Sequence, residues 1–167
     1  MELRDKVVAV TGGASGIGMG LCRRFHEEQV RGLVIADLNG EAASALATEL
    51  NATSVELDVR DESAIAAMVA ETESEYGQID LFCSNAGVLD LDGDDYWASS
   101  SANEVWQRNW DIHVMAHIYA ARACLPSMIE RGEGYFLHTV SAAGLLSQPF
   151  TAAYATTKHA AIGFAES

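Results

Sequence analysis

The 167-residue sequence is short of positive charge. It contains 10 lysine and arginine residues against 24 aspartate and glutamate residues, which gives a formal net charge of -14 at pH 7. Such a charge repels phosphate backbones and anionic lipid surfaces, so we expect neither a nucleic-acid partner nor a membrane partner. An anionic small molecule must instead be held by local dipoles and backbone N–H groups.

Cysteine is scarce too, and long apolar runs are missing. Cys22, Cys83 and Cys124 are odd in number and lie in separate apolar segments, which favours buried thiols in a reducing compartment over a disulfide framework. No apolar run approaches the roughly 18 residues of a membrane span. The charged start, Met1–Lys6, lacks the apolar stretch and cleavage site of a signal peptide. We therefore expect a cytoplasmic protein.

Short β-branched apolar runs alternate along the chain with longer segments of helical period. This pattern predicts an α/β fold with a parallel sheet, and the length suffices for one core, hence one domain over 1–167. The expected strands are Lys6–Thr11, Gly32–Ala36, Thr53–Asp58, Ile79–Ser84 and Gly134–Thr139. The expected helices are Gly16–Gln29, Gly40–Leu50, Glu62–Tyr76 and Ala102–Arg131, with a further helix from about Ala152.

The segment Leu89–Ser101 interrupts this alternation with Asp, Gly and Ser residues, and we expect a loop at the carboxyl edge of the sheet. Its aspartates do not match the spacing of a helix–loop–helix calcium site. A solvated acidic loop is therefore favoured, with calcium binding as the alternative. The four aspartates are Asp90, Asp92, Asp94 and Asp95.

A glycine-rich turn follows the first expected strand, with the sequence TGGASGIG at 11–18. Gly12 can form the tight turn, Gly16 lets the backbone approach a pyrophosphate, and Gly18 lets the next helix pack on the sheet. Ser15 and Ile17 lie where unpaired N–H groups at a helix start favour an anion. The turn predicts a dinucleotide site.

Asp37 stands at the end of the second strand, 25 residues after Gly12. A carboxylate there can accept hydrogen bonds from both ribose hydroxyls of an adenosine. The next residue, Leu38, is uncharged, and no arginine stands beside Asp37 to receive a 2′-phosphate. We expect NAD as the cofactor, with NADP less favoured. The alternative is that Asp37 serves only as the N-cap of the following helix.

Tyr154 precedes Lys158, one of only two lysines, by four residues. One helical turn places both side chains on the same face, so the ammonium can stabilise a phenolate and Tyr154 can act as acid and base. Ser141 follows the fifth strand, 13 residues before Tyr154. The alternatives are a buried tyrosine with a satisfied hydroxyl and a serine that caps a turn.

The glycine spacing G-x-x-x-G-x-G resembles the classical branch of the short-chain dehydrogenase/reductase family. Asp58-Val59 is similar to the family pair whose carboxylate contacts the adenine amino group, and Asn85-Ala86-Gly87 is similar to the turn that supports the sheet and lines the cofactor. Ser84 stands where many members have asparagine. The resemblance implies a doubly wound sheet of the Rossmann type and an NAD(P)-binding domain over 1–167.

The resemblance also implies an NAD-dependent oxidoreductase that interconverts a secondary alcohol and a ketone or aldehyde by hydride transfer. In such enzymes the tyrosine, here Tyr154, exchanges a proton with the substrate oxygen, and the lysine, here Lys158, also holds the nicotinamide ribose. The family serine, here Ser141, hydrogen-bonds the same substrate oxygen. The identity of the small-molecule substrate is not indicated. Ala143, Leu145 and Phe150 are candidates for the pocket wall.

The family's catalytic asparagine is replaced here by His113, seven residues after Trp106, and Asn109 lies one turn too early to take its place. The family residue bends its helix and holds a water that connects the lysine to solvent. We hypothesise that His113 substitutes, with slower or more pH-sensitive turnover, because imidazole titrates near neutral pH. His113 and His117 form an H-x-x-x-H pair, but Val114 stands where a zinc protease has Glu, so no metal is expected.

Family members are longer than this chain, so the last strands and the loop that covers the substrate are expected to be missing. The segment Ala152–Ser167 has helical composition without a C-terminal stop signal. The apolar stripe of 112–124 and the resemblance together imply a homodimer or homotetramer. The alternative to an enzyme is a non-catalytic, truncated module that binds a nucleotide or dimerises.

Overall fold

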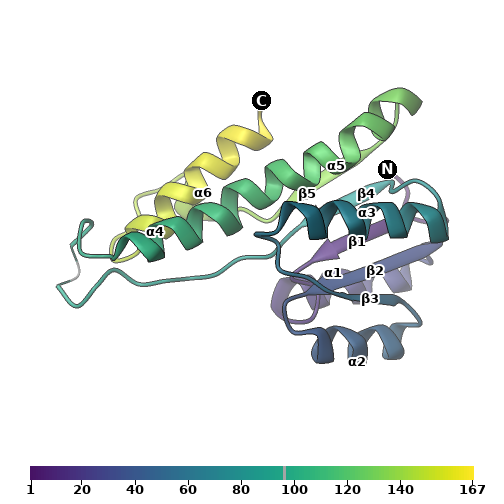
Figure 1. The fold of residues 1–167 in the computed structure, drawn as a ribbon, viewed down its shortest axis with the longest axis horizontal. Helices are drawn as coiled ribbons and strands as arrows, with labels where there is room; N and C mark the ends of the chain where they lie inside the picture. Colours follow the sequence, from purple (N-terminus) through teal and green to yellow (C-terminus); the bar gives the residue numbers. More distant parts are fainter. Residues whose placement is uncertain (96) are drawn as a thin grey trace.

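The computed structural model describes residues 1–95 and 97–167, and it has an α/β fold built on a parallel sheet (Figure 1). The five strands lie in the order β3-β2-β1-β4-β5. Each strand begins and ends within two residues of the predicted bounds. The strands are β1 (Val7–Thr11), β2 (Gly32–Asp37), β3 (Thr53–Glu56), β4 (Leu81–Ser84) and β5 (Tyr135–His138).

The helices α2 (Gly40–Leu50) and α3 (Glu62–Tyr76) have the predicted bounds because each is capped by the residue before it. Asn39 accepts a hydrogen bond from the N–H of Ala42, and Asp61 accepts from two backbone N–H groups of the first turn of α3. The remaining α-helices are α1 (Gly16–Glu27), α4 (Asn103–Trp110), α5 (Ala116–Arg131) and α6 (Ala152–Ala165), and a short 3₁₀ turn, η2 (Ala142–Gly144), follows β5.

The prediction of one continuous α-helix over Ala102–Arg131 is wrong. A π-helical turn, η1 (Asp111–Met115), separates α4 from α5, and the N–H of Ala116 bonds the carbonyl of Asp111, five residues earlier. A π turn inserts one residue into the helix and widens it locally. The apolar pattern could not reveal this insertion because Ile112, His113 and Val114 are all buried in the widened turn.

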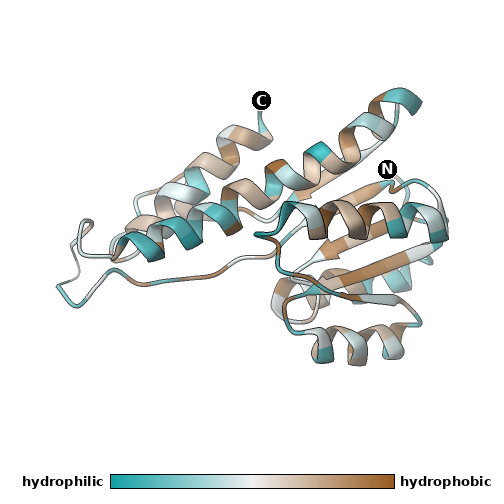
Figure 2. Ribbon diagram, in the orientation of Figure 1, coloured by the Kyte–Doolittle hydropathy of each residue, from teal (hydrophilic) through white to brown (hydrophobic). Residues whose placement is uncertain are grey.

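Alternate residues of each central strand point to opposite faces of the sheet, and helices cover both faces. One face packs on α1 and α2 and contains Val8, Val10, Cys22, Phe25, Ile35 and Leu46. The other packs on α3 and α5 and contains Val7, Ala9, Ile65, Met68, Phe82 and Ala120. Figure 2 shows the hydrophobic residues concentrated on β1 and β2. The three cysteines are buried free thiols, as predicted.

The order in which the parallel strands are added reverses in the middle of this sheet. From β1 the chain moves outward through β2 to β3, and then crosses back to place β4 on the other side of β1. In open α/β sheets, ligands bind in the crevice at the carboxyl ends of the strands where the order reverses. The fold therefore places its binding crevice between the ends of β1 and β4. No helix in the described ranges has the length and apolar character that a membrane crossing requires.

Candidate active site

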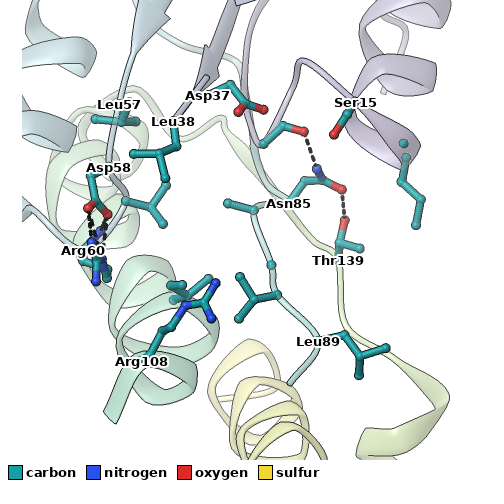
Figure 3. Close-up of a pocket in the computed structure, with 18 of the residues that line it drawn as sticks. Ser15, Asp37, Leu38, Leu57, Asp58, Arg60, Asn85, Leu89, Arg108 and Thr139 are labelled. Atoms are coloured by element: carbon teal, nitrogen blue, oxygen red, sulfur yellow. Dashed lines mark hydrogen bonds and ion pairs between the residues drawn. The ribbon is translucent and has the colours of Figure 1, made fainter. Parts of the chain in front are cut away.

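A cleft of about 700 Å³ lies at this reversal point (Figure 3). Its size is in the range of small-molecule and cofactor sites. The wall is built from the turn after β1, the start of α1, the end of β2, the segments after β3, β4 and β5, and residues of α4, η1 and α6. Of the predicted site residues, it includes Gly12, Ser15, Gly16, Ile17, Asp37, Leu38, Asp58, Val59, Asn85, Ala86, Gly87, Tyr154 and Lys158.

The glycine-rich turn has the conformation that its glycines allow. Gly12 and Gly16 have φ angles of 62° and 51°, in the left-handed region that disfavours a side chain. A Cβ on Gly12 would lie 2.8 Å from the Cα of Ala86, and one on Gly18 would collide with the carbonyl oxygen of Gly12. Gly18 therefore packs beneath the turn while Gly12 and Gly16 face the cleft. The N-terminus of α1 opens into it.

Asp37 lies beside the glycine turn and is held by two backbone N–H groups. Its carboxylate accepts from Ala14 and from Asn39, each at 3.0 Å. Asn39 is the N-cap of α2, and Asp37 accepts from its backbone N–H, so Asp37 is a partner of this cap without occupying the N-cap position. Leu38 is 67% exposed and forms the adjacent wall.

Asp58 lies after β3 and not in it, because the ladder between β2 and β3 ends at Asp37 and Glu56. Its carboxylate binds the guanidinium of Arg60, with Oδ2 at 2.6 Å from Nη2 (Figure 3). This hydrogen bonding holds the pKa of Asp58 below its usual value. Arg60 also lines the cleft, and the sequence analysis did not single it out.

Asn85 ties three strands together at the floor of the cleft (Figure 3). Its amide nitrogen donates to the carbonyl oxygens of Thr11 and Gly12 at 3.0 and 3.1 Å, and its Oδ1 accepts from the hydroxyl of Thr139 at 2.9 Å. The Thr11 hydroxyl in turn accepts from the backbone N–H groups of Asn85 and Ala86. The Asn-Ala-Gly turn therefore joins the ends of β1, β4 and β5.

Tyr154 and Lys158 share one face of α6, as their spacing predicts. The Lys158 Nζ lies 5.6 Å from the centre of the Tyr154 ring and donates to the carbonyl oxygen of Thr139 at 2.9 Å. Lys158 is 3% exposed. Burial lowers the pKa of this lysine from 10.5 to about 8, so its charge remains at neutral pH.

Ser141 follows β5 and begins η2, and it does not belong to the cleft wall. Its hydroxyl oxygen accepts from the N–H of Ala143 at 3.2 Å, and the hydroxyl hydrogen can still be donated. The three pocket-wall candidates are wrong for this cleft. Ala143 is buried, whereas Leu145 and Phe150 are 71% and 55% exposed outside the wall.

His113 is completely buried in η1, and both of its ring nitrogens have partners. Nε2 accepts from the backbone N–H of Val88 at 3.1 Å. The ring hydrogen must therefore be on Nδ1, which donates to the Thr157 hydroxyl at 2.9 Å. Burial, and then the charge of Lys158, lower the pKa of His113 to about 3. The expectation of titration near neutral pH is wrong.

His117 is turned toward β4 and β5 and not toward the partners of His113. Its Nδ1 lies 2.5 Å from the Ser84 hydroxyl, and its ring packs edge-on against His138 at 4.5 Å between ring centres. The two histidines of the H-x-x-x-H pattern, His113 and His117, therefore contact different groups. Within residues 1–95 and 97–167, no three side chains of the metal-ligating kinds converge.

Asp90 of the 89–101 segment also contacts a helix near the cleft. Asp90 accepts from Arg108 at 2.9 Å and from Asn109 at 2.8 Å, and both donors belong to α4. Arg108 and Leu89 both line the cleft (Figure 3). Arg108, Thr139 and the contacts of Asp90 were not predicted, because no local spacing connects residues so far apart in the chain.

A family model described as short chain dehydrogenase matches residues 6–167. The chain is 35% identical to 1-deoxy-11-beta-hydroxypentalenate dehydrogenase of Streptomyces exfoliatus, over all of this chain and 62% of that protein. It is 34% identical to 2-dehydro-3-deoxy-L-rhamnonate dehydrogenase (NAD(+)) of a Sphingomonas species, over 95% of this chain and 62% of that protein. The chain therefore spans less than two thirds of these relatives.

Solved structures give the same result. The apo form of LigO from a Sphingobium species superposes with a TM-score of 0.91 at 33% identity, over 99% of this chain and 62% of that chain. A short chain dehydrogenase/reductase from Burkholderia phymatum in complex with NAD gives a TM-score of 0.92 at 28% identity, over 99% and 59% of the two chains. The fold is thus shared with both.

Proposed function

Because this chain belongs to the short-chain dehydrogenase family, whose model matches residues 6–167, we propose that it works as an NAD(H)-dependent oxidoreductase. The reaction interconverts a secondary alcohol and the corresponding ketone or aldehyde by hydride transfer. One observation carries the proposal: Tyr154 and a buried, charged Lys158 lie on the wall of the same cleft as the glycine-rich turn. The substrate is a small molecule.

The residues present fit a dinucleotide along this cleft. The close approach of Gly12 to Ala86 leaves no room for a Cβ, and the adjacent N-terminus of α1 offers N–H groups to a pyrophosphate at Ser15, Gly16 and Ile17. Asp37 would hold the adenosine ribose. The adenine would lie beside Leu38, Asp58 and Val59, and the Asn85–Gly87 turn would support the middle of the molecule.

NAD is proposed over NADP on the charge at the adenosine end. If Asp37 holds the adenosine ribose, its carboxylate would repel a 2′-phosphate, and the residue that follows is the uncharged Leu38. The guanidinium of Arg60 also lines the cleft, but it is bound by Asp58 through both of its oxygens. A relative whose name includes NAD(+) and a solved structure in complex with NAD support this choice.

Tyr154 carries the proton of the reaction. In the oxidative direction its phenolate accepts the alcohol proton, and in the reductive direction its hydroxyl returns a proton to the carbonyl oxygen. The Lys158 ammonium stabilises the phenolate and would hold the nicotinamide ribose. Ser141 donates its hydroxyl hydrogen to the same substrate oxygen and fixes its position. Bound NAD(H) supplies the carbon that accepts or delivers the hydride.

His113 is proposed to replace the family asparagine as a structural link and not as a proton relay. It connects Val88, next to the Asn85–Gly87 turn, to Thr157, next to Lys158. Both ring nitrogens are used in these bonds, and the ring is neutral across the physiological range. The link holds the loop after β4 against α6.

Assembly as a homodimer or homotetramer is proposed through α4, α5 and α6, the helix that bears Tyr154. Three large apolar side chains on α4 and α5 are exposed: Trp110 by 41%, Leu125 by 40% and Ile129 by 72%. A partner subunit would cover them. Light scattering tests this, and Ile129→Glu is expected to shift the population toward monomer.

A cytoplasmic location is proposed because all three cysteines are buried thiols, which suits a reducing compartment.

Titration with NADH, followed by a screen of secondary alcohols with NAD⁺, tests the proposed function. The screen begins with the substrate types in the names of the two relatives above, a hydroxypentalenate and a deoxyrhamnonate. Saturable binding and NADH formation are expected, and Tyr154→Phe should abolish turnover while it preserves binding. Binding without turnover of any alcohol would favour the non-catalytic module, and the absence of binding would contradict both.

A further inference from the structure

Asp92 is a buried carboxylate within the acidic loop that follows β4. Only 7% of its surface is exposed, whereas Asp94 and Asp95 of the same loop are exposed. An aspartate is rarely buried without strong partners, because a carboxylate loses its hydration on burial. The expectation of a uniformly solvated acidic loop is therefore wrong at this residue.

The partners of Asp92 lie at the start of α6. Its Oδ1 accepts from the N–H of Ala152 at 2.8 Å and from the Ser101 hydroxyl at 3.3 Å. Its own backbone N–H donates to the carbonyl oxygen of Phe150 at 2.8 Å. One residue of a distant loop thus holds the chain on both sides of Thr151.

The residues at the start of α6 do not themselves cap the helix. Thr151 occupies the N-cap position, but its side chain makes no capping hydrogen bond, and its buried hydroxyl has no partner in the described part of the chain. Phe150 has a φ of 66°, a left-handed conformation that is strained for a non-glycine residue. Asp92 supplies the missing cap, and its negative charge suits the positive end of the α6 dipole.

The loop that carries Asp92 is fixed at its other side as well. Asp90 binds Arg108 and Asn109 of α4, and the Asn109 side chain is fully buried. The contacts of Asp90 and Asp92 therefore join α4 to the first turn of α6. Tyr154 is in that turn, two residues after Ala152.

We propose that Asp92 is a positioning residue for Tyr154. By binding Phe150 and Ala152 it fixes where α6 begins, and through the helix it places the Tyr154 hydroxyl relative to Ser141. Asp92 does not line the cleft, so it acts through α6 and touches no reacting group. The catalytic consequence rests on the proposed function, whereas the capping of α6 does not.

Three variants of the purified protein test this proposal: Asp92→Ala, Asp92→Asn and the exposed control Asp94→Ala. Hydrogen–deuterium exchange at 152–156, NADH affinity and the turnover number are measured for each. Asp92→Ala is expected to speed exchange by about fivefold, as loss of a typical cap implies. It should lower turnover by about tenfold or more with little change in NADH affinity. Asp92→Asn keeps an oxygen acceptor and should restore both, and Asp94→Ala should match the wild type.

Thr151→Ala keeps the proposal testable should Asp92→Ala fail to fold. Its hydroxyl makes no capping bond, so exchange at 152–156 is expected to stay at the wild-type rate. Faster exchange in Thr151→Ala would overturn the proposal, as would wild-type exchange in Asp92→Ala or equal impairment of Asp92→Ala and Asp92→Asn. Faster exchange in Asp92→Ala, in a protein that oxidises no alcohol, would sustain the cap and refute the proposed function.

Discussion

Lys158 is the residue at which function and stability conflict. Its folded pKa is about 8 against 10.5 in the unfolded chain, so between these values the unfolded chain binds a proton that the folded chain does not. The free energy of unfolding therefore rises with pH across this window. Below about pH 8 the folded chain carries the buried charge, and the full cost of burying that charge lowers the free energy of unfolding. Burial of Lys158 is thus a cost that the fold bears at neutral pH.

Replacement of Lys158 by methionine is expected to stabilise the protein and inactivate it. The apolar side chain removes the desolvation cost, so the free energy of unfolding at pH 7 should rise by about 1–3 kcal/mol in urea denaturation. Lys6→Met is the matched control, since Lys6 is partly exposed and paired with Asp80 and Glu133, and it should be neutral or slightly destabilising. A Lys158→Met variant less stable than wild type at pH 7 would count against this account.

Asp37 is the residue on which the choice of cofactor depends. The wild type should bind NADH more tightly than NADPH, and the double variant Asp37→Ser/Leu38→Arg should reverse the preference. Removal of one charge and addition of the opposite one should change the affinity ratio by about tenfold to a hundredfold, as measured by fluorescence titration. Glu56→Ser, at the end of β3, removes a carboxylate outside the cleft and should leave the ratio unchanged. Equal wild-type affinities would refute the assignment.

At the scale of elements, η1 and α5 carry two buried histidines whose protonation opposes folding. Burial lowers the pKa of both His113 and His117 from 6.5 to about 3. The unfolded chain therefore binds protons below pH 6.5 that the folded chain excludes until about pH 3. The contribution of the two neutral histidines to the free energy of unfolding is complete above pH 6.5 and is lost as the pH falls through this window.

The free energy of unfolding is accordingly expected to fall by about 2–4 kcal/mol between pH 7 and pH 5. Urea denaturation at the two pH values measures this loss. His113→Asn and His117→Asn should each reduce it, whereas His26→Asn, at an exposed position of α1, should not. The same loss in all three variants would show that other groups are responsible.

Elements differ in how well the sequence predicts them. The helices α2 and α3 were predicted with the right bounds because their caps and apolar periods are local signals. The π turn η1 was not predicted, since it is stabilised by tertiary contacts of His113 with Val88 and Thr157. The end of β3 was placed too late because strand pairing, and not residue type, ends it at Glu56.

At the scale of the whole molecule, the cleft is assembled from segments along the entire chain, from Gly12 to Lys158. A ligand there binds only the folded state. At about 100 times its dissociation constant, NADH should stabilise the protein by about 2.7 kcal/mol and raise the melting temperature by about 5–10 °C. Tyr154→Phe should retain most of this increase, and NADPH should give a smaller one. No increase at saturation would contradict a site in this cleft.

The sequence by itself determined the α/β alternation, the glycine-rich turn and the Tyr154–Lys158 face, because each depends on spacing within a few residues or on one strand–turn–helix unit. Tertiary structure alone decided the neutral state of His113 and the cap that Asp92 gives to α6. Both depend on burial and on partners 25 to 60 residues away. The local spacing of residues indicates neither burial nor a distant partner, so these features exist only once the chain has folded.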